Sequence, residues 1–255
     1  MILQTKIYDH HQLRQVESNL KAMLEGLNAS ISGLTTTQRG WVEVSVSGED
    51  EKVALKYLSD NVGFCPSTLD DVARFSSFKG FLVGPFKAKD ELKVDLGIAL
   101  PMDVDVAVPL QRLQAQLCDG RKIALGKFVE IFGFCERLPL HVRVVNVDLD
   151  VRRVEVELSE RQRRQYVGWA RSLHDRLLVL GASIGEVEAA VKVAGFGRDV
   201  VGVDSLGVFE HVVVCKLGTD AVGLVPGVGR LLRHAVLSVF SPRRVVGLLG
   251  SGFLE

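Results

Sequence analysis

The chain has 255 residues, 47% of them hydrophobic, which is enough apolar material for two or three small packed modules. Lys and Arg total 31, and so do Asp and Glu, so the zero net charge excludes a protein that coats duplex DNA through net charge alone. No run approaches the roughly 18 apolar residues of a membrane span, and residues 1–9 lack the apolar core of a signal peptide. We expect a cytoplasmic protein without a membrane partner.

The first predicted module, residues 1–70, reads βαββα. Residues 2–8 alternate as a strand, and residues 10–27 place Leu and Val at helical spacing behind Asp9, a residue type that caps helices. Strands at 30–36 and 41–47 and a helix at 49–62 follow. This order is half of a ferredoxin-like sandwich.

The second predicted module, residues 71–159, is a barrel of five short strands. The valines at 142, 144, 154 and 156 repeat with a period of two, as half-buried antiparallel strands require. The five strands are expected at 80–84, 92–97, 104–109, 141–147 and 153–158. A long insertion, residues 111–139, separates the third strand from the fourth. It is expected to form short helices at 110–117 and 123–132, which either close one end of the barrel or carry a partner contact.

The third predicted module, residues 160–255, is an α/β layer. A capping sequence at Ser159 opens a long helix over 160–180. A helix at 184–194, strands at 200–206 and 209–216, a helix at 220–232 and a strand at 235–240 follow. This order fits a ferredoxin-like or KH-like layer, so the predicted fold class is α+β with three modules.

Aromatic and basic side chains occur together on the predicted barrel strands and their connections. Rings of this kind stack on bases, and basic groups contact phosphates. The candidate RNA-binding residues are Phe81, Phe86, Lys87, Lys89, Lys93, Arg112 and Arg143. The densest cluster, at 86–89, is equally well explained as a solvated hairpin tip.

A glycine-rich stretch at 218–230 is a second candidate site. Gly227, Gly229 and Arg230 would let backbone amides and a guanidinium approach an anion. Close packing of a helix on a sheet explains the same glycines and is the favoured interpretation. The spacing of a P-loop or of a dinucleotide-binding fold is absent.

We expect no metal, cofactor or catalytic residue. His10 and His11 point to different faces of a helix, and His211 and Cys215 lie too far apart along a strand to share a metal ion. The four cysteines form no CxxC pair, which favours buried free thiols.

Three sequence runs in the second module resemble an S1-type OB barrel. They are Val94-Asp95-Leu96-Gly97, Val108-Pro109-Leu110 with Leu113, and Val156-Glu157-Leu158-Ser159. The resemblance implies binding of single-stranded RNA. The chain departs from the pattern at Lys93, where the family usually has an aromatic residue, and at Glu155, where it often has a basic one. A barrel that binds protein therefore stays open.

A wider resemblance rests on the C-terminal runs at 197–201, 206–211, 215–221 and 223–226. With the N-terminal βαββα order and the central barrel, they make the chain similar to the archaeal domain-of-unknown-function family 2110. That resemblance implies an archaeal, cytoplasmic protein and implies no activity.

These observations predict a non-catalytic factor in translation or RNA metabolism that binds single-stranded RNA or a ribonucleoprotein assembly through the barrel. One alternative is a scaffold whose barrel binds a protein partner. Another is an enzyme that uses residues 199–230 on a phosphorylated ligand.

Overall fold

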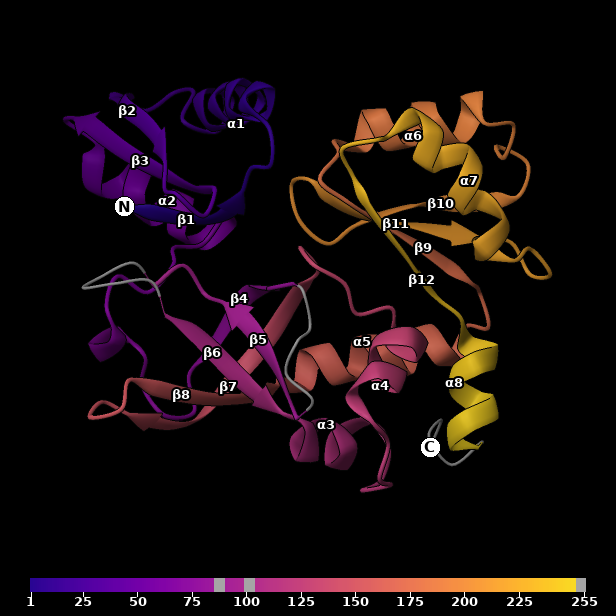
Figure 1. Ribbon diagram of the computed structural model, residues 1–255. Helices are drawn as coiled ribbons and strands as arrows, with labels where there is room; N and C mark the ends of the chain where they lie inside the picture. Colours follow the sequence, from indigo (N-terminus) through magenta and orange to yellow (C-terminus); the bar gives the residue numbers. More distant parts are fainter. Residues whose placement is uncertain (85–89, 99–103, 251–255) are drawn as a thin grey trace. The chain divides into compact units, whose positions relative to one another are not determined.

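The computed structural model describes residues 1–84, 90–98 and 104–250 (Figure 1). Its contacts divide the chain into two compact units. The first contains Met1–Val72 and Leu96–Val104, and the second contains Ala73–Asp95 and Asp105–Glu255. The fold is α+β, as predicted, and its three modules comprise two small sheets and a closed barrel.

The N-terminal module has the predicted βαββα order. Its elements are β1 (Ile2–Lys6), α1 (His10–Met23), β2 (Ala29–Thr36), β3 (Trp41–Gly48) and α2 (Glu51–Asn61). Asp9 caps α1, because its carboxylate accepts a hydrogen bond from the His11 amide at 3.0 Å. The sheet order is β1-β3-β2, antiparallel throughout, which is a ferredoxin-like sheet that lacks its fourth strand.

A short segment after α2 lies where that fourth strand would be. Leu3 and Phe64 form an antiparallel bridge, and the Cys65 amide donates to the Ile2 carbonyl at 2.9 Å. Residues 96–98 complete this unit. A Cβ on Gly97 would lie 2.6 Å from the Cys65 sulfur and 3.2 Å from the Trp41 ring, so only glycine allows so close an approach.

The second unit begins with a closed five-stranded barrel. Its strands are β4 (Ser77–Leu82), β5 (Glu91–Asp95), β6 (Asp105–Pro109), β7 (Pro139–Asp148) and β8 (Arg153–Leu158). They follow the order β4-β5-β6-β8-β7, with β6 and β8 parallel and the other pairs antiparallel. This is the strand order of an OB-type barrel. The predicted period of two holds, since Val142, Val144, Val154 and Val156 are all buried.

The insertion between β6 and β7 forms the two predicted helices, α3 (Leu110–Leu117) and α4 (Leu125–Phe132). α4 ends in an aromatic cluster that includes Phe132, Phe134 and Tyr166 and extends to Phe240 of the C-terminal module. A Cβ on Gly133, which follows α4, would lie 3.0 Å from the side chain of Leu178. The insertion therefore packs the barrel module against the C-terminal sheet.

The predicted helix over 160–180 is wrong in its second half. α5 (Glu160–Arg171) ends early, and β9 (Arg176–Leu180) follows as an inner strand of the next sheet. All of β9 is buried, so its apolar residues need no alternation, and their spacing also matches a helical stripe. Ser159 caps α5 as expected, accepting from the Gln162 amide.

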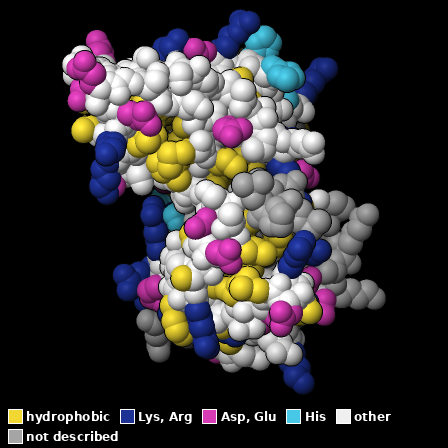
Figure 2. Space-filling model, turned by 90° about the vertical axis from the view of Figure 1, so that its left-hand side faces the viewer, with side chains coloured by type: hydrophobic (Ala, Val, Ile, Leu, Met, Phe, Trp, Pro, Cys, Tyr) yellow, Lys and Arg dark blue, Asp and Glu magenta, His cyan; other side chains and the backbone are white. Residues whose placement is uncertain are grey.

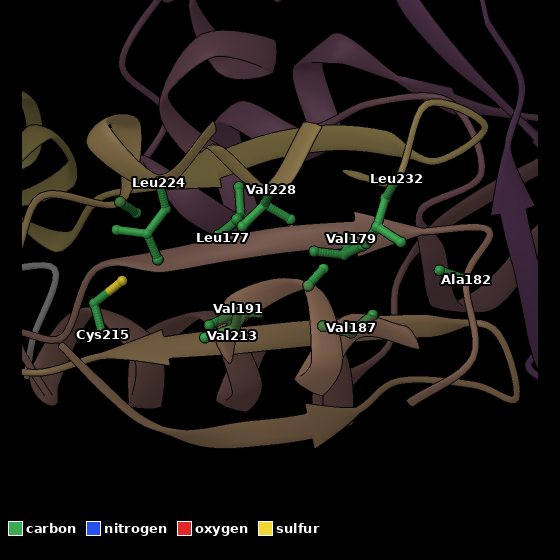
Figure 3. Close-up of a cluster of buried hydrophobic side chains, with 12 residues drawn as sticks. Leu177, Val179, Ala182, Val187, Val191, Val213, Cys215, Leu224, Val228 and Leu232 are labelled. Carbon is green, nitrogen blue, oxygen red and sulfur yellow. The ribbon is translucent and has the colours of Figure 1, made fainter. Parts of the chain in front are cut away.

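With β9 included, the C-terminal module is ferredoxin-like rather than KH-like. Its further elements are α6 (Ile184–Val193), β10 (Val200–Ser205), β11 (Glu210–Cys215), α7 (Ala221–Leu231), β12 (Val236–Phe240) and α8 (Pro242–Leu249), the last absent from the sequence prediction. The sheet order is β10-β11-β9-β12, and neighbouring strands are antiparallel. Side chains of β9 and β11 pack against α6 and α7 in a fully apolar core (Figure 3). No helix in the described ranges is long and apolar enough to cross a membrane.

Candidate nucleic-acid interface

Two of the predicted RNA-binding residues meet on the outside of the barrel. Arg143 of β7 donates from Nε to Oε1 of Glu157 at 3.0 Å, and Arg112 of α3 donates from Nη1 to Oε2 of the same carboxylate at 3.1 Å. Side-chain exposure is 50% for Arg143, 36% for Arg112 and 12% for Glu157. Two guanidinium groups therefore share one carboxylate, which leaves a net positive charge and spare N–H donors at the surface.

Phe75, which is bonded through its backbone to the same strand as Arg143, is the most exposed phenylalanine in the described chain, at 63%. Its amide donates to the carbonyl of Val144, the residue after Arg143, at 2.9 Å. The guanidinium of Arg74 lies 4.9 Å from the centre of the Phe75 ring. An aromatic ring and cations thus occur side by side at the start of the first barrel strand.

The backbone of Phe75 is held in a conformation that phenylalanine rarely adopts. Ala73 to Ser76 form a turn closed by a hydrogen bond of 3.1 Å, and Phe75, at its third position, has a φ of 70°. Glycine or asparagine is the usual residue there, because a Cβ atom crowds the neighbouring carbonyl oxygen and the short polar side chain of asparagine offsets this by local hydrogen bonds. Strain of this kind is concentrated at functional sites. We call Arg74, Phe75, Arg112, Arg143 and Glu157 the barrel surface.

The surroundings of β7 strengthen the positive field. Burial, followed by the nearby charges of Arg161 and Lys79, lowers the pKa of His141 from 6.5 to about 4. His141 is therefore neutral at physiological pH. The cations that depress its pKa, Arg161 of α5 and Lys79 of β4, add their positive charge near β7 to that of Arg112 and Arg143.

The other side of the barrel is more acidic. Arg153 of β8 pairs with both Glu91, at 3.1 Å, and Glu155, at 3.4 Å. Lys93 is exposed on β5, opposite Ala107. Figure 2 shows basic and acidic side chains interspersed around apolar ones on the barrel face turned to the viewer, in the lower part of the picture. Among the described residues, the excess positive charge is therefore confined to the barrel surface as defined above, and it does not extend around the rest of the barrel.

The remaining predicted RNA-binding residues are not part of the barrel surface. Phe81 is 1% exposed, so its ring is not available to a base. Phe86, Lys87 and Lys89 lie outside the described residues. The sequence analysis missed Phe75 because nothing in the residues around it indicates which aromatic side chain a closed barrel leaves outside. It also missed Glu157, which the alternation of the closing strand places on the outer face.

Two of the three residues of the candidate anion site pack closely. A Cβ on Gly227 would lie 2.7 Å from the Phe196 ring, and one on Gly229 would lie 3.2 Å from the Leu237 side chain. Arg230 is exposed, and its Nε donates to the carbonyl of Pro226 at 3.5 Å. These glycines let α7 approach the sheet and the end of α6.

No group of His, Cys, Asp and Glu in the described part of the chain is arranged to hold a metal ion. All four cysteines are free thiols, and Cys65, Cys118 and Cys215 are buried as predicted. Burial raises the pKa of Cys118 and Cys135 to about 12 and that of Cys215 to about 11. Thiols with such a pKa are poor nucleophiles at neutral pH.

Models of known protein families match both ends of the chain. Residues 1–67 match the DUF2110 N-terminal domain and residues 174–240 match the DUF2110 C-terminal domain. These ranges coincide with the two ferredoxin-like modules, and the barrel lies between them. No curated protein matches the chain. The chain belongs to the DUF2110 family.

Proposed function

We propose that this protein is a non-catalytic RNA-binding factor that contacts single-stranded RNA through the barrel surface. The observation that carries the proposal is Phe75, an aromatic ring 63% exposed in a strained turn, with Arg74 against the ring and its amide bonded to the residue after Arg143. An exposed ring in a positive-φ position costs stability twice, through apolar exposure and through backbone strain. A base stacked on the ring would offset both costs.

The surface has the parts that sequence-tolerant binding of single strands needs. Stacking on an aromatic side chain contributes about 1–3 kcal/mol per base, and cations contact the backbone phosphates. Arg112 and Arg143 each keep N–H groups that Glu157 does not use. Lys93, exposed on β5, is a further proposed contact, and so are Phe86, Lys87 and Lys89, which lie outside the described residues. We place this function in an S1-type barrel of an archaeal, cytoplasmic protein that works within a ribonucleoprotein assembly.

The test is an anisotropy titration with mixed-sequence single-stranded RNA at low and physiological salt. Arg112→Gln/Arg143→Gln is the test variant, and Arg163→Gln/Arg164→Gln is the control. The control arginines pair with Glu160 on α5 and carry the same charge. We expect the test variant to lose about tenfold in affinity and about 1.4 in the slope of log affinity against log salt, from two lost phosphate contacts. Equal losses in both variants, or no salt-dependent binding by the wild type, would overturn the proposal.

A second candidate, a scaffold that binds a protein partner, is favoured by the hairpin between β7 and β8. Leu149 and Val151 at its tip are 54% and 68% exposed. A partner that covers them would lose affinity in Leu149→Ser/Val151→Ser, whereas RNA binding through the barrel surface would not change.

A further inference from the structure

The C-terminal module contains a pocket of about 230 Å³. Its walls come from three segments that are distant in sequence: the turn after α5, the start of α7 and the start of α8. Leu173, on its rim, is the only apolar lining residue among those described, is 53% exposed and has a φ of 57°. The pocket is therefore polar, and one of its edges is held in a strained conformation.

The two carboxylates in the lining are already occupied by the protein. Asp175 accepts from the Ser241 hydroxyl at 2.9 Å and from the Ala221 amide at 3.4 Å. Asp220 accepts from the Val222 amide at 2.9 Å and so caps α7. Asp175 therefore connects the three walls through hydrogen bonds, and Asp220 stabilises the start of the helix that forms one of them.

The two arginines in the lining are not occupied in this way. In the described part of the chain, the exposed side chains of Arg243 and Arg244 form no hydrogen bond or ion pair. Arg244 acts on Glu130 of α4 only from a distance, where it adds weakly to the larger effect of Lys127 in lowering the pKa of Glu130. Guanidinium groups that share a pocket without a carboxylate partner are suited to an anion with several oxygen atoms.

A third guanidinium lies just behind the lining. Arg176 is 6% exposed and follows Asp175 in the chain. It donates to the carbonyls of Trp169 and His174 and to the Ser172 hydroxyl, and its buried Nε has no hydrogen-bond partner among the described residues. Asp204 and Asp175 act electrostatically on Arg176, so its charge is balanced within the fold and Arg243 and Arg244 are the guanidinium groups that face the pocket.

We propose that this pocket binds the phosphate group of a phosphorylated ligand, with Arg243 and Arg244 as the main donors. Pockets that enclose a drug-sized ligand have volumes of about 300–1,000 Å³. At about 230 Å³ the pocket accommodates a phosphate or diphosphate group, and the rest of the ligand extends into solvent. The lining is open at Gly218, where a Cβ would meet no atom within 4 Å. This site is separate from the barrel surface and does not depend on the function proposed for it.

Calorimetric titration of the full chain with inorganic pyrophosphate tests the proposal. Arg243→Gln/Arg244→Gln should weaken binding at least tenfold, and Arg243→Lys/Arg244→Lys should weaken it less, because lysine keeps the charge and loses the planar fork. Arg163→Gln/Arg164→Gln, which removes the same charge from α5, should bind as the wild type does. Each of these arginines is exposed, so the melting temperature should stay close to the wild-type value. Equal weakening in both glutamine variants, or no binding by the wild type, would overturn the proposal.

Two RNA decamers, one with a 5′-phosphate and one with a 5′-hydroxyl, identify the source of the phosphate. A preference for the phosphorylated decamer that disappears in Arg243→Gln/Arg244→Gln supports the proposal and assigns the pocket to an RNA end. Pyrophosphate binding without that preference supports it and assigns the pocket to a small phosphorylated molecule. The Arg112→Gln/Arg143→Gln variant separates the two sites, since it should keep pyrophosphate binding in full.

Discussion

The amide of Phe75 donates to the carbonyl of Val144 at 2.9 Å, and this hydrogen bond ties a residue with a φ of 70° to the edge of β7. The turn that contains Phe75 therefore extends the barrel ladder, and the ring has little freedom to turn inward. The pairing of β4 with β7, which begins at Ser77, holds Phe75 in its strained backbone conformation.

The first prediction concerns this residue. Phe75→Asn should lower the affinity for single-stranded RNA five- to tenfold, because the stacking ring is lost. The free energy of unfolding should stay within about 1 kcal/mol of the wild type, because asparagine tolerates a positive φ and the lost ring is mostly exposed. Anisotropy and urea denaturation measure the two effects. Phe75→Tyr should retain binding, and an unchanged affinity of the asparagine variant would remove Phe75 from the interface.

A second prediction concerns Glu157, which accepts hydrogen bonds from both Arg112 and Arg143. Glu157→Gln removes the negative charge between the two guanidinium groups, so RNA affinity should rise about threefold. The free energy of unfolding should fall by about 1 kcal/mol, because two partly exposed ion pairs are weakened. Stability and binding thus change in opposite directions. A fall in affinity would show that Glu157 positions the arginines for RNA instead of competing with it.

A third prediction tests the packing at the turn between β10 and β11, which Lys79 of the barrel contacts. A Cβ on Gly207 would lie 1.9 Å from Oε2 of Glu210, a residue that is 1% exposed. The same Cβ would lie 3.2 Å from Nζ of Lys79, which donates to the Leu206 carbonyl. Gly207→Ala should therefore lower the free energy of unfolding by about 2 kcal/mol.

Gly202→Ala on β10 is the matched control for that substitution. No atom lies within 4 Å of the Cβ that it adds, so its free energy of unfolding should match that of the wild type or exceed it slightly. Urea denaturation compares the two alanine variants. Equal stability would contradict the packing described at Gly207.

A fourth prediction concerns alkaline pH. Burial raises the pKa of Cys118 and Cys135 to about 12 and that of Cys215 to about 11, whereas unfolded thiols titrate near 8.5. The unfolded chain therefore loses protons first, and stability should fall as the pH rises from about 8.5 to 11. Burial also raises the pKa of Tyr166, which adds to the loss. Urea denaturation at pH 8 and pH 10.5 measures the change, and Cys135→Ala should show a smaller one. A constant free energy of unfolding would contradict the buried thiols.

A fifth prediction concerns mildly acidic pH. The pKa of His141 is lowered to about 4, so below about 6.5 the unfolded chain binds a proton that the folded chain does not. The contribution of neutral His141 to stability is complete above pH 6.5 and is lost as the pH falls toward 4. His141→Gln should therefore lose less stability than the wild type between pH 6.5 and pH 5. Parallel losses in the two proteins would show that His141 titrates normally.

Much of the fold could be predicted from local pattern. The alternating valines of β7 and β8 and the helical stripes of α1, α6 and α7 repeat at the periods of their elements, and each can be read without knowledge of its partners. β9 could not be identified in this way. Its residues are buried on both faces, so it lacks alternation, and Leu177 and Leu180 also continue the spacing of the helix before it.

The candidate site depended far more on tertiary structure. The sequence by itself determined the order of modules, the free and mostly buried thiols, and the presence of arginines and phenylalanines in the barrel segment. Only the closed barrel decided that Phe81 lies inside, that Phe75 lies outside, and that Arg112 and Arg143 share Glu157. Strand register and turn conformation set which face a side chain occupies, and both arise from pairings between segments that are distant along the chain.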